Sequence, residues 1–270
     1  MQMMATDTQI THAQRAWLYF VCALVLAFLV VPCLLVIPMS FSADSFLHFP
    51  PQRLSLRWYR SFLASDDWMH GAWVSTEVAI ATVVLATALG TAGAYAIRHL
   101  GGKVGGAMRA VFMLPMIAPV ILIAVGVFFV YARLGLNNTL TGLVLSHTLL
   151  ALPYVVITVG TGLETCDLTQ EMVACSLGAG RLRAFFEITL PQIAPAIYSS
   201  LLFSFMTSFD ETVIVLFVSG GDTSTLTRLM FENIRDQQDP TIAAISTLLI
   251  VISTAALISA QALSKKNRND

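Results

Sequence analysis

The sequence predicts an all-α, polytopic membrane protein, and three observations lead to this fold class. Of the 270 residues, 56% are hydrophobic and only 11% are charged, against about 25% charged residues in a typical soluble domain. The mean hydropathy is +0.76. Six apolar stretches are each long enough to cross a hydrocarbon core of about 30 Å as a helix. Most of the chain therefore cannot face water.

The six predicted transmembrane helices follow one another along the chain. They are Trp17–Ile37, Ala72–Ile97, Ala110–Tyr131, Thr139–Leu163, Ala196–Val218 and Thr241–Leu263. The first is too long for the core of a signal peptide, and no small-residue cleavage site follows Pro32, so we expect it to be retained. We predict a single transmembrane domain over residues 1–270, with an N-terminal span and outer loop over 1–70 and a core over about 71–263.

The outer loop runs from about Pro38 to Gly71 and is expected to contain one short helix. Ser55–Tyr59 is followed by Phe62 and Leu63, and Trp and Tyr prefer the headgroup zone of a bilayer. We interpret this stretch as an interfacial helix that anchors the loop, and favour that role over contact with a substrate.

The distribution of Lys and Arg predicts that both termini are cytoplasmic. With the N-terminus inside, nine of the fifteen basic residues fall in cytoplasmic segments: Arg15, Arg98, Lys103, Arg109, Arg181, Arg183, Lys265, Lys266 and Arg268. The compact loop Arg98–Arg109 and the tail Lys265–Arg268 lie close to span ends, where the positive-inside rule counts most. This orientation also places residues 164–195, between the fourth and fifth spans, in the cytoplasm.

The segment Glu171–Pro195 is moderately polar between two long apolar spans, so it must face water or a partner. It carries a short apolar face beside charged residues: Leu177, Leu182, Phe185 and Phe186 beside Arg181, Arg183 and Glu187. This pattern predicts two short amphipathic helices. Gly178 can take a positive φ and is the expected hinge between them, and Pro191 is expected to begin the next span.

The same segment resembles the coupling loop of permease subunits of bacterial ATP-driven importers. A small-residue helical turn ends in Leu177-Gly178, and nine residues later Ile188-Thr189-Leu190-Pro191 follows. In that family the loop docks in a groove of the ATPase subunit and transmits its closure to the membrane helices. The resemblance therefore implies an ATPase-coupling role for Glu171, Ala174, Leu177, Gly178, Phe185, Ile188, Leu190 and Pro191.

One position departs from the family pattern. Aligned on Gly178, the family's Glu-Ala-Ala falls on Met172-Val173-Ala174, so its glutamate is replaced and Glu171 is displaced by one residue. Whether Glu171 makes the family's usual ionic contact is therefore open.

No catalytic or cofactor motif is present in the sequence. Gly101-Gly102-Lys103 is not a phosphate-binding loop, because Ile97 replaces the first glycine and Val104 stands where Ser or Thr must hold magnesium. The four cysteines match no zinc spacing, and the net charge of −1 gives no basic field for nucleic acid. We expect no enzyme activity, no metal and no cofactor in this chain, with ATP and Mg²⁺ bound by a partner subunit.

Polar residues inside the predicted spans indicate a pathway for a cation. Glu77, His147 and Asp210 lie about five to eight residues below the outer ends of three spans, or roughly 7 to 12 Å deep. Tyr154 shares a helical face with His147, and Glu211 follows Asp210 about 100° around the helix, so these two acids are not expected to line one pore. Ionisable groups in a bilayer usually face a cavity or one another. Both interpretations stay open for Glu77 and Asp210, whereas a structural hydrogen bond is favoured for His147.

Several further motifs resemble permeases of the spermidine/putrescine type, specifically the second of their two permease subunits. These motifs are Ser208–Glu211, Ser55–Tyr59, His147–Tyr154 and Asp239–Ala244. The resemblance implies a type I importer permease fold in the bacterial inner membrane, a second permease subunit, ATPase subunits, a periplasmic solute-binding protein and a polyamine substrate. An importer of another small solute, such as an opine, an aminophosphonate or an amino acid-like compound, is the alternative. A secondary transporter is disfavoured because neither internal repeats nor broken helices are evident in the sequence, and a membrane enzyme because no nucleophile is evident.

Overall fold

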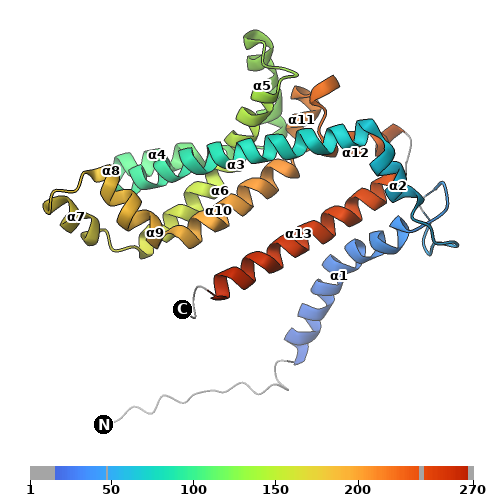
Figure 1. The fold of residues 1–270 in the computed structure, drawn as a ribbon, viewed down its shortest axis with the longest axis horizontal. Coiled ribbons are helices and arrows are strands. Elements are labelled where there is room, and N and C mark those ends of the chain that lie inside the picture. The colour runs from blue at the N-terminus through green and yellow to red at the C-terminus, as the bar shows by residue number, and fades with distance from the viewer. Residues whose placement is uncertain (1–15, 47, 237–239, 267–270) are drawn as a thin grey trace. The chain divides into compact units, whose positions relative to one another are not determined.

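The computed structural model describes residues 16–46, 48–236 and 240–266 (Figure 1). Arg15, Arg268 and Asp239, which the sequence analysis used, lie outside this part of the chain. Regular structure in the described residues is helical, apart from one isolated bridge between Ser42 and Leu54. The chain forms two compact units, Met1–Phe62 with Gln237–Asp270, and Leu63–Asp236. The all-α prediction is confirmed.

The first unit contains the first and last predicted spans. Helix α1 (Ala16–Ser40) packs along α13 (Thr241–Lys266) (Figure 1). The predicted interfacial helix is also present, as α2 (Arg57–Ala64). The hydroxyl groups of Tyr59 and Ser40 are hydrogen-bonded at 2.7 Å, which joins the start of α2 to the end of α1.

The second unit is built on three long helices that pack together: α3 (Asp66–Leu100), α6 (Leu140–Thr165) and α10 (Ala194–Phe209) (Figure 1). Their shared core contains Ala86, Val155, Val159, Leu163 and Ile193. A Cβ on Gly90 would lie 2.6 Å from Val155, so a glycine is required where α3 and α6 approach each other.

Three of the predicted spans are single helices that are long and apolar enough to cross a membrane: Trp17–Ser40, Asp66–Leu100 and Leu140–Thr165. The third predicted span, Ala110–Tyr131, is wrong as a single helix. The chain there forms α4 (Gly102–Ile117) and α5 (Val120–Leu134), which are bent by 100°. Ala118 between them is extended (ψ 139°), because the ring of Pro119 excludes the preceding residue from the helical region.

The fifth predicted span, Ala196–Val218, is also divided. Helix α10 ends at Phe209 and the next helix is α11 (Val213–Val218). Glu211 lies in the break, where its Oε1 accepts a hydrogen bond from the backbone N–H of Ile214 at 2.7 Å. Such a side chain competes with the helical backbone and caps a new helix instead. A short turn, η2 (Gly221–Thr223), and α12 (Leu226–Asp236) complete the unit.

Four short elements connect α6 to α10. They are α7 (Thr169–Ser176), α8 (Arg181–Ala184), the π-helical turn η1 (Phe185–Thr189) and α9 (Leu190–Gln192). The last three form one continuous segment that meets α10 at 79°. Pro191 therefore does not begin the membrane span as predicted. The bend falls at Ile193, and α10 begins at Ala194 with Pro195 in its first turn. A proline is tolerated there because the backbone N–H groups of the first turn have no partner within the helix.

Candidate functional site: a docking loop and an acidic cavity

The turn between α7 and α8 is a glycine-dependent helix end. Gly178 has φ +97°, which is strained for residues with a Cβ. The backbone N–H of Ala179 donates to the carbonyl of Ala174 at 3.0 Å, and that of Gly178 donates to Cys175 at 3.1 Å. These are the two hydrogen bonds of a Schellman motif. Gly178 thus has the positive φ that the sequence predicted, in a turn between two short helices.

An apolar surface projects from this turn. Leu177 is 84% exposed, Leu182 is 77% exposed and Phe186 is 60% exposed. We name these three residues, which lie on both sides of the turn, the docking face. Met172 and Val173 of α7 are also exposed, at 62% and 53%. Apolar groups left in water at this level are typical of a surface that a partner covers.

Phe185, which the sequence assigned to ATPase coupling, faces the interior instead. Its ring lies 4.9 Å from the ring of Tyr95 on α3, centroid to centroid, in an edge-on arrangement. Both phenylalanines were predicted to lie on the apolar face of the loop, but only Phe186 is exposed there. Two adjacent phenylalanines give no sequence signal for which one turns inward.

Glu171 on α7 is buried, with 5% of its surface exposed. Its carboxylate accepts hydrogen bonds from the hydroxyl of Tyr95 and, at 2.5 Å, from Oγ1 of Thr189. His99 Nε2 lies 4.0 Å from the same carboxylate. Glu171 thus binds groups of its own chain, and its side chain is not on the surface that a partner would contact.

The remaining predicted coupling residues differ in burial, and Ala174 on α7 is partly buried. Leu190 packs against the core that α3, α6 and α10 share, Ile188 is partly buried and Pro191 is exposed in α9. At the other end of the loop, Asp167 Oδ1 accepts a hydrogen bond from the backbone N–H of Thr169 at 3.0 Å, at the start of α7. Hydrogen bonds from Thr169 lower the pKa of the Asp167 carboxyl.

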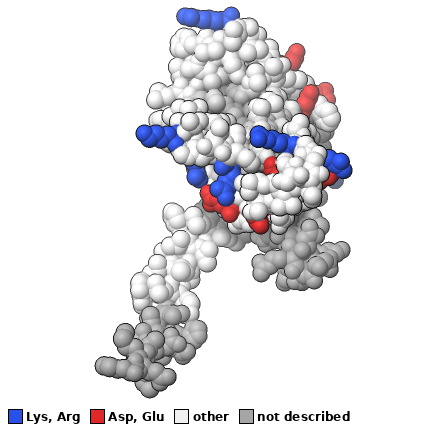
Figure 2. All heavy atoms as spheres, turned by 90° about the vertical axis from the view of Figure 1, so that its left-hand side faces the viewer, with Lys and Arg blue, Asp and Glu red and all other residues white. Residues whose placement is uncertain are grey.

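Charged side chains lie around this end of the unit. Figure 2 faces the end that carries α7 to α9 and shows Lys, Arg, Asp and Glu among a larger number of uncharged residues. The loop itself contributes an exposed ion pair, in which Arg183 Nε donates to Glu187 Oε1 at 2.9 Å. Exposed pairs of this kind contribute little to stability, so these charges serve solubility and orientation more than folding.

A second site lies where α10 ends, beside α6. A cavity of about 360 Å³ is lined by Tyr154, Phe203, Met206, Thr207, Asp210 and Glu211. Both acids line it, contrary to the expectation that they diverge by 100° around one helix, because the helix stops at Phe209 and the backbone turns between them. The cavity combines two carboxylates with two aromatic rings, which together attract cations.

The other two residues of the predicted pathway lie apart from this cavity. His147 is 1% exposed, and its Nδ1 is hydrogen-bonded to Oγ of Ser208 at 2.8 Å. It joins α6 to α10 as a structural contact, the role that the sequence favoured. Glu77 is exposed on α3 and does not line the cavity.

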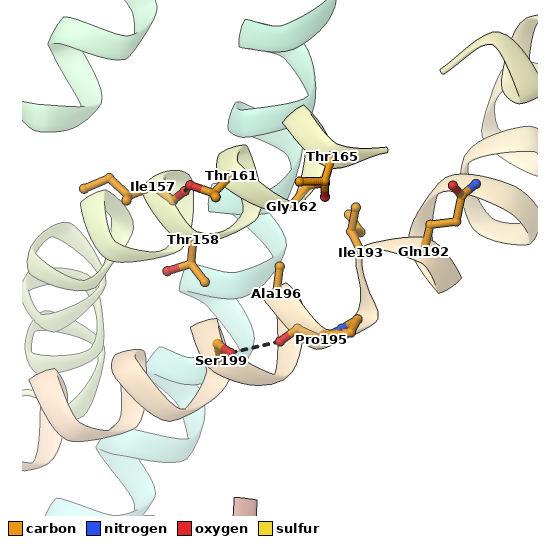
Figure 3. A pocket seen from close by; sticks show the side chains of 10 residues that line it. All are labelled: Ile157, Thr158, Thr161, Gly162, Thr165, Gln192, Ile193, Pro195, Ala196 and Ser199. Atoms are coloured by element: carbon orange, nitrogen blue, oxygen red, sulfur yellow. Dashed lines mark hydrogen bonds between the residues drawn. The ribbon is translucent and has the colours of Figure 1, made fainter. Parts of the chain in front are cut away.

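A groove of about 510 Å³ continues along the same two helices toward the loop (Figure 3). Its hydroxyl-bearing residues are Thr158, Thr161 and Thr165 of α6 and Ser199 of α10. Each hydroxyl donates to a carbonyl of its own helix, at 2.7 to 3.0 Å. Because the proton is used internally, the oxygens offer acceptor lone pairs to the groove. Tyr154, which lines the acidic cavity, lies one turn before Thr158 of the groove on α6.

Comparison with known proteins identifies relatives over almost the whole chain. Residues 86–269 match the family described as binding-protein-dependent transport system inner membrane component. The chain is 28% identical over 245 residues to the spermidine/putrescine transport system permease protein PotC of Haemophilus influenzae, covering 91% of this chain and 95% of that protein. It is 30% identical over 242 residues to the putrescine transport system permease protein PotI of Escherichia coli, covering 87% and 85%.

Solved structures show the same fold at low sequence identity. A bacterial ABC transporter involved in the import of the acidic polysaccharide alginate matches with a TM-score of 0.72 at 15% identity, over 98% of this chain and 99% of that chain. The alginate transporter in complex with a periplasmic protein bound to an alginate pentasaccharide gives 0.67 at 16% identity, over 94% and 96%. At these sequence identities, the likenesses establish the fold alone.

Proposed function

Because the chain belongs to the family of binding-protein-dependent transport system inner membrane components, we propose that it is a permease subunit of an ATP-driven importer for a polyamine such as spermidine or putrescine. It lies in the bacterial inner membrane with both termini in the cytoplasm. It forms half of the pathway with a second permease subunit. A periplasmic protein delivers the solute, and separate ATPase subunits bind ATP and Mg²⁺ and hydrolyse the nucleotide.

The acidic cavity is the observation that carries the choice of solute. Polyamines are extended polycations, and the cavity presents the carboxylates of Asp210 and Glu211 beside the ring of Tyr154. An ammonium group is a donor with no acceptor, so it suits carboxylates, an aromatic face and the acceptor oxygens of the adjoining groove. The relatives that transport spermidine and putrescine support the same choice.

The docking face supports the coupling role. Leu177, Leu182 and Phe186 expose apolar surface on a loop between two core helices, and an ATPase subunit is the partner that family membership implies. No solute chemistry enters this part of the proposal, so it holds equally for an importer of another small solute.

The test compares uptake per assembled complex in proteoliposomes that contain both permeases, the ATPase and the binding protein. Asp210→Asn keeps the shape of the side chain and removes its charge, so we expect spermidine uptake to fall about tenfold, equivalent to about 1.4 kcal/mol. Glu164→Gln is the control, since Glu164 is exposed on α6 and lines neither cavity. The ATPase subunit should co-purify equally with all variants.

Two results would contradict the polyamine assignment. One is parental uptake by Asp210→Asn complexes; the other is a parental complex that hydrolyses ATP yet imports neither spermidine nor putrescine. The second result would favour the alternative solute classes. Uptake that proceeds without ATP and follows an ion gradient would instead indicate a secondary transporter.

A further inference from the structure

The buried carboxylate of Glu171 joins three elements that are distant in sequence. Glu171 itself is on α7, Tyr95 is 76 positions earlier near the end of α3, and Thr189 is 18 positions later at the end of η1. The α3 helix is a core element of the unit, and η1 leads through α9 into α10. One side chain therefore connects the first helix of the loop to the core helix α3 and to the segment that leads into α10.

The burial of this carboxylate makes its hydrogen bonds strong and specific. An ionised carboxylate is acceptor-only, and here both of its oxygens are occupied, Oε1 by the tyrosine and Oε2 by the threonine. Hydrogen bonds to a charged group are about twice as strong as neutral ones. Removing either donor in a site that is 5% exposed leaves carboxylate oxygen without its partner, which is costly.

The chain segments that carry the docking face also hold the carboxylate: Glu171 is on α7, six residues before Leu177, and Thr189 is on η1, three residues after Phe186. Leu177 follows the end of α7, and Leu182 and Phe186 lie in α8 and η1. Ala184 between them is buried, and the ring of Phe185 packs on the ring of Tyr95. Polar and aromatic contacts thus converge on Tyr95 from both halves of the loop. The π-helical turn η1 is a local departure from regular helix, which commonly marks a functional site.

We propose that Glu171 is a positioning residue that ties the loop to α3 and η1, so that displacement of the docking face reaches α3 and α10 and is not absorbed within the loop. Apart from Glu171, α7 and the segment from α8 to α9 are joined by the turn at Gly178 and by an exposed hydrogen bond from Gln192 Nε2 to Gln170 Oε1 at 3.2 Å, so the carboxylate provides the buried polar connection between them. The inference rests on the proposed function for the source of the displacement, an ATPase subunit. It does not depend on which solute is carried.

The first test measures solute transported per ATP hydrolysed in proteoliposomes of the full complex, with labelled spermidine. Three variants each remove one partner of the hydrogen bonds made by the Glu171 carboxylate, with little change in side-chain volume: Glu171→Gln, Tyr95→Phe and Thr189→Val. We expect the transport-to-hydrolysis ratio to fall about tenfold for Glu171→Gln and less for the other two, with the ATPase subunit still co-purifying. Glu164→Gln, an exposed carboxylate near the end of α6, is the matched control and keeps the parental ratio.

The second test needs no solute. In a background with the four native cysteines changed to serine, spin labels are attached at Gln170→Cys on α7 and Leu100→Cys at the end of α3, both exposed positions. In the full complex with a non-hydrolysable ATP analogue, the parental chain gives a narrow distance distribution, and Glu171→Gln broadens it. A parental complex that imports no spermidine would overturn the polyamine proposal and leave this second measurement intact.

Three results would overturn the inference. The first is a parental transport-to-hydrolysis ratio in Glu171→Gln, and the second is an unchanged distance distribution in that variant. The third is loss of the ATPase subunit from Glu171→Gln while Tyr95→Phe and Thr189→Val behave like the parent, because that pattern would mean that Glu171 contacts the ATPase directly.

Discussion

At the scale of single residues, Gly178 shows how one backbone angle sets the shape of the loop. Its φ of +97° completes the helix end, and a β-branched residue there is strained by about 1–3 kcal/mol. We expect Gly178→Val to insert normally into the membrane and to lose most of its uptake, because the turn that presents Leu177 and Leu182 together is distorted. ATP-dependent uptake per assembled complex measures the effect.

Gly180 provides the control for this prediction. A Cβ added to either glycine would meet no neighbouring atom within 4 Å, so the two positions differ in backbone angle and not in space, since Gly180 has φ −67°. Gly180→Val should therefore transport close to the parental rate. Equal transport by the two valine variants would show that the left-handed turn is not needed for coupling.

At the scale of elements, the loop divides its apolar residues between a docking face and an internal contact. Leu182 is 77% exposed, whereas Phe185 packs on Tyr95. Covering a leucine fully is worth about 1.5–3 kcal/mol, so Leu182→Ala should weaken association with the ATPase about tenfold and leave the melting temperature of the isolated chain unchanged. Phe185→Ala should instead lower the melting temperature.

Two measurements separate these roles: titration of detergent-solubilised permease with the ATPase subunit, and thermal unfolding of the permease alone. Weaker association for Phe185→Ala without any loss of stability would contradict the division. So would unchanged association for Leu182→Ala, since that side chain would then remain in water within the complex.

At the scale of the whole molecule, the expected orientation in the membrane rests on the charged residues that lie at the two ends of α3. His70 Nε2 lies 2.8 Å from the carbonyl oxygen of Asp222, which places Asp222 at the start of α3. Lys103 follows the end of the same 35-residue helix, which is about 50 Å long at 1.5 Å per residue. By the positive-inside rule, we expect the Lys103 end to lie in the cytoplasm.

Cysteine labelling tests this orientation. In a cysteine-free background, a membrane-impermeant thiol reagent should modify Lys103→Cys and Leu177→Cys only in inverted vesicles, and Asp222→Cys only in spheroplasts. Labelling of Leu177→Cys in spheroplasts would show that the docking loop lies outside the cytoplasm, where no ATP is available. That result would contradict the proposed coupling to an ATPase.

Features that depend on local chemistry could be predicted from the sequence. The all-α membrane class follows from the length and hydropathy of the apolar stretches, and the hinge at Gly178 follows from the conformations open to glycine. The helix break before Pro119 was also present in the sequence, because proline restricts the residue before it. It was missed because an uninterrupted apolar run is equally consistent with one straight helix.

By itself, the sequence determined the helical class, which segments are apolar enough for a bilayer and where the loop turns, since these depend on neighbouring residues. Only the tertiary structure decided which side chains meet. Glu171 is hydrogen-bonded to Tyr95, 76 positions away, and His147 to Ser208, 61 positions away. The helix break at Asp210 lets the side chains of Asp210 and Glu211 line the same cavity. Such pairings depend on how α3, α6 and α10 pack, and helical periodicity along one segment carries no information about the helix that lies opposite.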